Sequence, residues 1–308
     1  MLTIISGATA LGLLWAIATI GVYISYRVLD VADLTVEGSI VLGAAVASTL
    51  IANGTSPLLA TLTAVLAGAL AGLASALLHT KLKIPALLAG ILCMIALYSV
   101  NIRVMHKSAN VSLLRKETLL SFADGLGFTK NGATILLGGL CCIGVILLIR
   151  LFLKTEIGFA VRATGGNGKM ATAQGIDVDT MTILGLMLSN ALVGLSGALI
   201  AQYQGFADVQ MGQGAIVIGL ASLFIGEVLF GRTGILRSLV AVSLGAVVYR
   251  MIIALVIELG MLATDLKLFT AITVAAALYL PVAKKQIAQK NVQRRERHVE
   301  TDEPAKGV

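Results

Sequence analysis

Residues 57–78 decide the fold class, because they read PLLATLTAVLAGALAGLASALL without one charged side chain. As a helix this stretch is about 33 Å long at 1.5 Å per residue, which matches a hydrocarbon core of about 30 Å. The rest of the 308-residue chain is similar: 57% of its residues are hydrophobic and 13% are charged, and the mean hydropathy is +0.95. Soluble proteins carry roughly 25% charged residues. The composition therefore predicts a polytopic membrane protein and excludes a secreted, cytosolic or nucleic-acid-binding one.

Nine stretches of the chain are long and apolar enough to cross a bilayer as helices. They are residues 4–26, 34–52, 57–78, 84–104, 132–153, 182–203, 214–230, 235–257 and 266–282. The predicted fold is an all-α integral membrane helix bundle with about nine spans, in a range of eight to ten. The second and seventh stretches are short and flanked by polar, glycine-containing segments, so we expect them to be broken or re-entrant.

Lysine and arginine residues predict the orientation, because they concentrate on the cytoplasmic side. With the tail after Val282 placed inside, fifteen Lys and Arg residues fall on the inner side and four on the outer side. The four outer residues are Lys107, Arg115, Lys116 and Lys130. We therefore expect the N-terminus outside, the C-terminus inside and residues 283–308 as a polar cytoplasmic tail. This topology explains most of the net charge of +7.

Two distant segments of the chain resemble each other. Residues 33–43 (DLTVEGSIVLG) align with residues 208–219 (DVQMGQGAIVIG) with one insertion. An odd number of spans separates them, so the halves would be inverted, with repeat 1 at about 4–104 and repeat 2 at about 182–282. Inverted repeats with short, glycine-interrupted helices are typical of transporters. Chance similarity between glycine-rich helices is the alternative. Both repeats belong to one predicted membrane domain, residues 1–282.

The predicted cytoplasmic loop, residues 154–181, is long and contains capping signals. Asn167 can cap a short helix and Gly175 suits the left-handed position that ends it. The run GGNGK at 165–169 resembles a phosphate-binding loop, but Ala163 and Met170 stand where that motif needs Gly and Ser or Thr. The chain therefore has no Walker A motif of its own.

The loop sequence 158–176, GFAVRATGGNGKMATAQGI, resembles the coupling loop of ABC importer permeases of the branched-chain amino acid and ribose group. The shared pattern is G-x-x-x-R-A-x-G-x-N-x-x-x-A-x-x-x-G-I. Its Gly-Gly-Asn form is that of the sugar-type branch, since amino-acid-type members carry an acidic residue there. Residues 33–39 also resemble the D-L-S-x-G-S segment of ribose-type permeases, with Glu37 as one extra residue. The resemblance covers about residues 5–282.

This resemblance implies contact with an ATPase subunit. The residues carried over to that contact are Gly158, Arg162, Ala163, Gly165, Gly166, Asn167, Met170, Ala171 and Gly175. We expect Gly165 and Gly166 to supply backbone conformations closed to bulkier residues, and Ala171 to press into the ATPase.

The resemblance also implies the function and the partners. We expect the permease subunit of an ATP-binding-cassette importer in the bacterial inner membrane, moving an amino acid rather than a sugar or nucleoside. The chain resembles the subgroup that is paired with binding proteins for aromatic amino acids. Two ATPase copies, an external binding protein and a second permease copy (a homodimer rather than a heterodimer) are the expected partners. ATP and Mg²⁺ would bind the ATPase, and this chain would hold no cofactor or metal and would not be an enzyme. The alternative is an ion-coupled secondary transporter that uses an intramembrane carboxylate.

Polar residues within the apolar stretches are candidates for the translocation path, since they are costly at that depth. These residues are Asp33, Thr35, Glu37, Gly38, Ser39, Gln213, Gly214 and Asn190, with Asn101 and Ser189 as weaker candidates. Glu227 and Arg250 either fix helix packing or act in transport. Their different depths argue against a direct pair, so we expect Glu227 to reach Arg232 or Arg237, and Arg250 to lie nearer Glu258 and Asp265.

Two further patterns have open interpretations. Ala64, Gly68, Gly72 and Ala76 form a stripe of small residues, which suits either packing within the bundle or a dimer seam. Residues 106–130 space Leu113, Leu114, Leu119, Leu120 and Phe122 like an amphipathic helix, which would dock the binding protein or lie on lipid headgroups.

Overall fold

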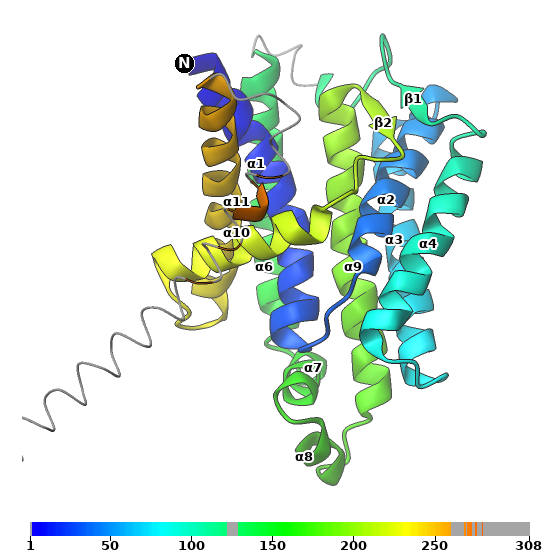
Figure 1. Ribbon diagram of the computed structural model, residues 1–308, viewed down its shortest axis with the longest axis vertical. Coiled ribbons are helices and arrows are strands. Elements are labelled where there is room, and N and C mark those ends of the chain that lie inside the picture. Colours follow the sequence, from blue (N-terminus) through cyan, green and yellow to red (C-terminus); the bar gives the residue numbers. More distant parts are fainter. Residues whose placement is uncertain are drawn as a thin grey trace, which may run out of the picture.

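A computed structural model describes residues 2–121 and 129–259, together with positions 268, 270–272, 275 and 279. Within them the chain is a bundle of helices with two short strands (Figure 1). The elements are α1 (Leu2–Tyr23), the π-helical turn η1 (Ile24–Val28), α2 (Thr35–Ala52), α3 (Pro57–Thr80), α4 (Ala86–Val104), β1 (Asn110–Ser112), α6 (Lys130–Phe152), α7 (Glu156–Gly166), α8 (Gly168–Ala173), α9 (Val178–Gln204), β2 (Phe206–Asp208), α10 (Ala215–Phe230) and α11 (Ile235–Glu258).

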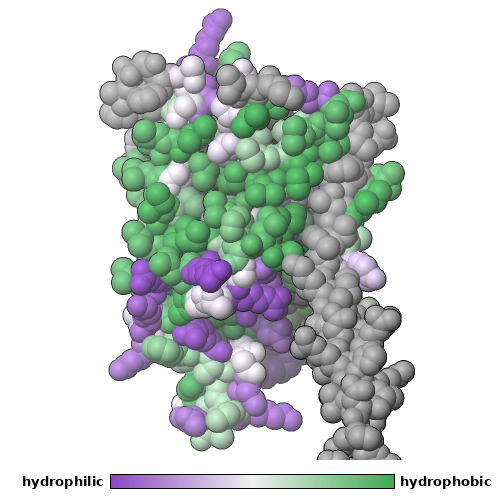
Figure 2. Space-filling view, turned by 90° about the vertical axis from the view of Figure 1, so that its left-hand side faces the viewer, coloured by the Kyte–Doolittle hydropathy of each residue, from purple (hydrophilic) through white to green (hydrophobic). Residues whose placement is uncertain are grey.

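Seven of the described helices are long and apolar enough to cross a membrane, namely α1 with η1, α2, α3, α4, α6, α9 and α11. Figure 2 shows a broad hydrophobic band on one face of the molecule, with hydrophilic residues gathered toward the lower end. Many large apolar side chains of α3, α4 and α6 are exposed, among them Leu66, Ile95 and Leu140. Exposed leucines at this density are stable only against lipid or another protein, so the membrane fold predicted from composition is confirmed.

Eight of the nine predicted spans correspond to described helices. The seventh, α10, has 16 residues and is therefore about 24 Å long, too short to cross the bilayer by itself. In Figure 1 it runs across the bundle and not along its long axis. The ninth predicted span, residues 266–282, and the tail, residues 283–308, lie outside the continuously described residues.

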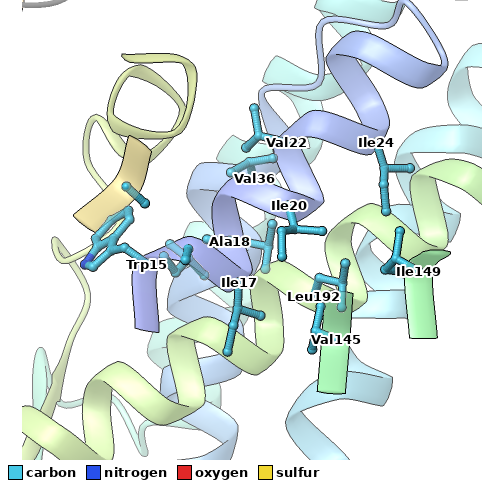
Figure 3. Packing of buried hydrophobic residues seen from close by; sticks show 14 of the residues in the cluster. Trp15, Ile17, Ala18, Ile20, Val22, Ile24, Val36, Val145, Ile149 and Leu192 are labelled. Carbon is cyan, nitrogen blue, oxygen red and sulfur yellow. The ribbon is translucent and has the colours of Figure 1, made fainter. Parts of the chain in front are cut away.

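Helix α1 forms the centre of the main hydrophobic core. Leu14, Ile17 and Ile20 are fully buried and pack with Val145 and Ile149 of α6 and Leu192 of α9 (Figure 3). The remaining residues of the same cluster include Val36 of α2. Because α1 is buried on several sides, its sequence is apolar all round, as expected of a helix at the centre of a bundle.

The stripe of small residues in α3 packs inside the chain. A Cβ atom at Gly68 would collide with the carbonyl oxygen of Asn190, and one at Gly72 with that of Leu186. Ala64 and Ala76 are fully buried. The stripe therefore lets α3 approach α9 at backbone distance, and its interpretation as a dimer seam is wrong.

Helices α2 and α10 begin inside the bundle after non-helical segments. Residues 29–34 lead from η1 to α2, and residues 209–214 lead from β2 to α10 (Figure 1). The neighbours of the two regions also correspond: α3 packs against α9 as α11 packs against α1, and α2 contacts α9 as α10 contacts α1. The contacts of the two regions are therefore alike, and the division of the chain into two inverted repeats stays a prediction.

A two-stranded antiparallel sheet covers one end of the bundle, where the sequence predicted only helices. β1 pairs with β2, with Val111 opposite Ala207. The amphipathic helix expected over residues 106–130 is wrong for residues 106–120, which form turns and β1. Leu113 and Leu120 are buried and Leu114 is 78% exposed. Residues 122–128, including Phe122, lie outside the described part.

Candidate functional site

The first turns of α2 and α10 meet inside the bundle. The Glu37 carboxylate oxygen Oε1 accepts a hydrogen bond of 3.1 Å from the backbone N–H of Gly214. Gly214 has a φ of 77°, a left-handed conformation that favours glycine. The backbone at Gly212 also contacts Glu37 and Val41 without room for a side chain. Glu37, a residue of α2, therefore satisfies a backbone donor at the start of α10, where a carboxylate is electrostatically favoured.

A pocket of about 500 Å³ opens beside this contact, between α2, the middle of α4 and the segment before α10. Pockets of roughly 300–1,000 Å³ are usual for small-molecule ligands. The wall is formed by Glu37, Gly38, Val41, Met94, Ile95, Tyr98, Ser99, Asn101, Val209, Gly212 and Gln213. Glu37, Gly38 and Gln213 were among the eight residues predicted for the path, so the structure brings three of them to one cavity.

Four other predicted path residues lie behind the pocket wall and form a hydrogen-bond network. Asn190 Nδ2 donates to Asp33 Oδ2 at 2.7 Å, and Ser39 Oγ donates to Asn190 Oδ1 at 2.7 Å. The backbone N–H of Thr35 donates to Asp33 Oδ1 at 2.9 Å. Thr35, Ser39 and Asn190 are fully buried and Asp33 is 3% exposed. These side chains therefore fix the start of α2 against α9 and do not line the cavity.

Asn101 of α4 lines the pocket and holds an unused acceptor. Its Nδ2 donates to the carbonyl oxygen of Gly38 at 3.2 Å, while its Oδ1 has no hydrogen-bond partner although the residue is 2% exposed. Sequence reasoning ranked Asn101 low and missed Met94 and Tyr98. These three residues follow an i, i+4, i+7 spacing, so the helical period would have placed them on one face of α4.

The second candidate region is the pair of helices α7 and α8, which project from the end of the bundle below α1 and α9 (Figure 1). The Thr155 hydroxyl oxygen accepts from Gly158 N at 3.2 Å and caps α7. Asn167 Oδ1 accepts from Met170 N at 3.1 Å and caps α8, and Gly175 follows with a φ of 82°. The predicted cap and terminator of the short helix are confirmed, and α7 is an additional helix.

The third helix start in this region is capped by Asp177. Its carboxylate accepts from the backbone N–H groups of Asp179 and Thr180 and from the Thr180 hydroxyl. These hydrogen bonds, with Thr180 as the main donor, hold the pKa of Asp177 below its ordinary value. The caps of α7, α8 and α9 thus make this region a set of rigid helices and not a flexible loop.

Two expectations for this region are wrong. Gly165 and Gly166 are the last residues of α7 and neither has a positive φ; Gly165 is required because it sits against the backbone of Val28 and Leu29, where a Cβ would collide. Ala171 is 3% exposed and cannot press into a partner, whereas Met170 is 60% exposed. Successive residues of a helix point about 100° apart, so only one of them faces outward.

The other residues carried over to the coupling contact divide in the same way. Gly158 is buried against the backbone of Phe152 and Leu153. Arg162 and Ala163 are exposed on α7, and the Arg162 guanidinium lies 5.3 Å from the centre of the Phe159 ring. Arg162 and Ala163 therefore belong to the exposed surface of α7, whereas Gly158 and Gly165 are the positions where α7 packs against neighbouring backbone.

An ion cluster around the buried carboxylate of Glu227 joins η1 to α10. Glu227 accepts from Arg27 Nε and Nη2, both at 2.8 Å, and pairs with Arg232 Nη2 at 2.7 Å. The side chain of Glu227 is 4% exposed. The expected contact of Glu227 with Arg232 is confirmed. The alternative contact with Arg237 is not formed, because the Arg237 side chain donates to the carbonyl oxygen of Phe230 and to the Thr233 hydroxyl. The bidentate partner Arg27 was not predicted from the sequence.

Arg250 lies apart from this cluster, as its depth predicted. Its guanidinium carbon is 4.5 Å from the centre of the Trp15 ring, a cation–π contact. None of the ion pairs found among the described residues includes Glu258, and Asp265 lies outside the described part. The described residues contain no cluster of three His, Cys, Asp or Glu side chains able to hold a metal ion.

Comparisons with known proteins agree with this architecture. The family described as "Branched-chain amino acid transport system / permease component" matches residues 4–278. The chain is 42% identical to the tyrosine transport system permease protein of Clostridioides difficile (strain R20291), over 86% of this chain and 87% of that protein. It is 34% identical to an uncharacterised protein of Rickettsia prowazekii (strain Madrid E), over 84% and 91% of the two chains.

A shorter match reaches an inner membrane ABC transporter permease of Escherichia coli (strain K12), with 32% identity over 57% of this chain and 53% of that protein. No solved structure matches the chain. The family match spans nearly all of the membrane part, including the 158–176 segment that carried the resemblance. The chain belongs to the family of branched-chain amino acid-type permease components of ABC transporters.

Proposed function

We propose that this chain is the translocating subunit of an ATP-driven importer for an amino acid, with L-tyrosine as the first substrate to test. The observation that carries the proposal is the 42% identity to a tyrosine transport permease over nearly the whole length of both chains. The caps of α7, α8 and α9 support it further, since a rigid projecting element is needed to transmit force from a separate ATPase.

We assign the ATPase contact to the exposed surface of α7 and α8, with Met170 at its centre. Met170 is an exposed apolar residue on a short helix, and apolar side chains rimmed by polar ones are typical of protein interfaces. The seat of α7 on η1 at Gly165, and the pairing of Arg27 with Glu227, link this surface mechanically to α10. Movement at the ATPase can therefore reach a helix whose start adjoins the pocket.

The complete importer would contain two ATPase copies, a second copy of this permease and an external binding protein, in the bacterial inner membrane. The charge distribution supports α8 on the cytoplasmic side and the β1–β2 sheet on the outside. Leu114→Cys should then react with an impermeant thiol reagent added outside intact cells, and Ala173→Cys only after permeabilisation. The reverse pattern would overturn this orientation.

Substitution of Met170 tests the coupling. We expect Met170→Asp to reduce co-purification of the ATPase about tenfold. Burial of a carboxylate in the contact costs binding free energy, and a loss of about 1.4 kcal/mol weakens a complex tenfold. Met170→Leu is the matched control and should keep the complex. Neither variant should change the thermal unfolding of the permease, since position 170 is exposed.

Two results would contradict the proposal. Full co-purification and binding-protein-stimulated ATP hydrolysis with Met170→Asp would remove the assigned contact. Uptake of L-tyrosine into vesicles without any ATPase, abolished by an uncoupler, would instead establish the ion-coupled alternative.

A further inference from the structure

We propose that the pocket beside Glu37 is a recognition site within the permease for the protonated amino group of the transported amino acid, which rests on the proposed function as an amino acid importer. The site consists of Glu37 on α2 and Asn101 on α4, two residues that line one cavity of about 500 Å³. An apolar wall completes it.

The pocket has a negative charge that no cation of the described chain compensates. Glu37 lines the pocket and Asp33 lies four residues before it, so two carboxylates lie at the start of α2. The pocket wall contains no Lys, Arg or His, and none of the ion pairs among the described residues involves either carboxylate. A carboxylate at membrane depth is costly unless a positive group approaches it. The cavity therefore suits a cationic group.

Glu37 and Asn101 also carry hydrogen-bond acceptors that are not used within the described chain. Oε1 of Glu37 is used by the N–H of Gly214, and within the described chain no hydrogen bond occupies Oε2. Asn101 Oδ1 is buried without a partner, although buried amide oxygens are nearly always paired. An ammonium group carries three donors and no acceptor. The second oxygen of Glu37 and the amide oxygen of Asn101 can receive two of those donors.

The two helix starts beside the pocket do not form an anion site. Two helices begin near this point, and helix starts are common anion sites. Here each start is already neutralised by the chain itself: Asp33 accepts from Thr35 N at 2.9 Å and Glu37 accepts from Gly214 N at 3.1 Å. A ligand with a net negative charge, such as phosphate, would meet the Glu37 carboxylate and no cation on the pocket wall. A sugar would leave the charge of Glu37 without compensation.

The remaining wall selects the side chain of the substrate. Val41, Met94, Ile95, Tyr98 and Val209 contribute apolar surface to the same cavity. Methionine sulfur and tyrosine rings pack favourably on aromatic groups. The pocket thus fits an amino acid with an aromatic or large aliphatic side chain, held by its amino group.

Charge removal at Glu37 tests the site in the complete importer, reconstituted in proteoliposomes with its ATPase and binding protein and supplied with radiolabelled L-tyrosine. Glu37→Gln keeps an oxygen that can accept from Gly214 but removes the charge. We expect uptake to fall about tenfold, the loss typical of one charge-assisted hydrogen bond. Co-purification of the ATPase should remain close to wild type, because the surface of α7 and α8 assigned to the ATPase contact is untouched.

A second variant returns the charge from the opposite wall. Adding Asn101→Asp to Glu37→Gln places a carboxylate on α4 in the same pocket and should recover most of the uptake. Glu258→Gln is the matched control, because it removes a carboxylate outside this pocket and should transport normally. Asn101→Leu removes the second acceptor without a charge change, together with the Nδ2 donor to the carbonyl oxygen of Gly38, and should also lower uptake.

The outcomes separate the two proposals. Wild-type uptake by both Glu37→Gln and Asn101→Leu would overturn the recognition site, and so would a loss of uptake that Asn101→Asp does not rescue. Either result leaves the importer function intact, provided that wild type shows ATP-dependent uptake. Absence of ATP-dependent L-tyrosine uptake by the wild-type complex would instead count against the proposed function.

Discussion

The pocket and the α7–α8 region differ in where their polar groups find partners. In the pocket region, the bonds Asn190–Asp33, Ser39–Asn190 and Glu37–Gly214 join residues 157, 151 and 177 positions apart. In the α7–α8 region, the backbone N–H groups of Gly158, Met170 and Thr180 each donate to a capping side chain three residues earlier. The pocket region therefore forms only when the whole bundle is assembled, whereas the helix caps of the α7–α8 region depend on residues close together in the sequence.

This difference predicts different consequences of mutation. A side chain in the pocket network is buried and satisfies groups on other helices, so its loss affects folding of the membrane part. A side chain at the surface of α7 or α8 affects transmission to a partner and leaves folding largely unchanged. Mutants in which both thermal stability and stimulated ATP hydrolysis are measured therefore test the distinction.

The largest expected effect belongs to Asn190→Leu. Leucine has nearly the shape of asparagine, but it cannot donate to Asp33 or accept from Ser39, so a buried carboxylate oxygen loses its partner. We expect a loss of roughly 3 kcal/mol in stability, measured as a lower thermal unfolding midpoint in detergent and a lower yield from membranes.

Ser39→Ala in the same network is the graded control. It removes one neutral donor and leaves the bond from Asn190 to Asp33 intact, so we expect a loss of about 1 kcal/mol. Equal stability of Asn190→Leu and wild type would mean that the network does not hold α2 against α9.

An intermediate effect is expected at the seat of α7. Gly165→Ala would push a methyl group into the backbone of Val28 and Leu29, and overpacking of this kind costs about 1–3 kcal/mol. Because α7 contacts η1 at this position, ATP hydrolysis stimulated by the binding protein should fall clearly, whereas the thermal unfolding midpoint should fall only slightly. Both quantities are measured on the same purified complex.

The adjacent glycine provides the matched control. A Cβ at Gly166 meets no atom within 4 Å, and alanine has the higher helix propensity by roughly 1 kcal/mol. Gly166→Ala should therefore be neutral or slightly stabilising with full coupling. If the two variants behave alike, backbone flexibility at the end of α7 matters and the seat on η1 does not.

The helices and local caps could be predicted from the sequence because their causes are local. Uninterrupted apolar runs located eight spans that the structure describes as helices, and Asn167 and Gly175 marked the ends of α8. The same reasoning placed Glu37 and Gln213 together, since the two segments around them resemble each other. Each of these signals lies within a few residues or within one repeated motif.

The tertiary pairings could not be predicted, because no local pattern encodes them. The bond from Arg27 to Glu227 joins residues 200 positions apart, and the strand pair β1–β2 depends on how the bundle places the C-terminal ends of α4 and α9. The face of α8 was also misjudged: without the position of α9, nothing distinguished buried Ala171 from exposed Met170. Tertiary packing decides such cases, and local propensity does not.

The smallest expected effect is a pH dependence of amide hydrogen exchange at the start of α9, where the capping side chain Asp177 can be protonated. Asp177 is fully exposed, and its pKa is lowered from 3.8 mainly by its hydrogen bonds with Thr180, with a smaller contribution from the charge of Lys81. A lowered folded pKa means that the cap stabilises the helix fully above about pH 4 and is lost as the pH falls through the folded value. Hydrogen exchange of the Asp179 and Thr180 amides, corrected for intrinsic rates, should therefore accelerate on acidification. Asp177→Asn keeps a capping oxygen that does not titrate, so its corrected rates should stay flat with pH. Parallel acceleration in both proteins would assign the change to the bundle as a whole, and would show that this helix start depends on distant contacts as the pocket does.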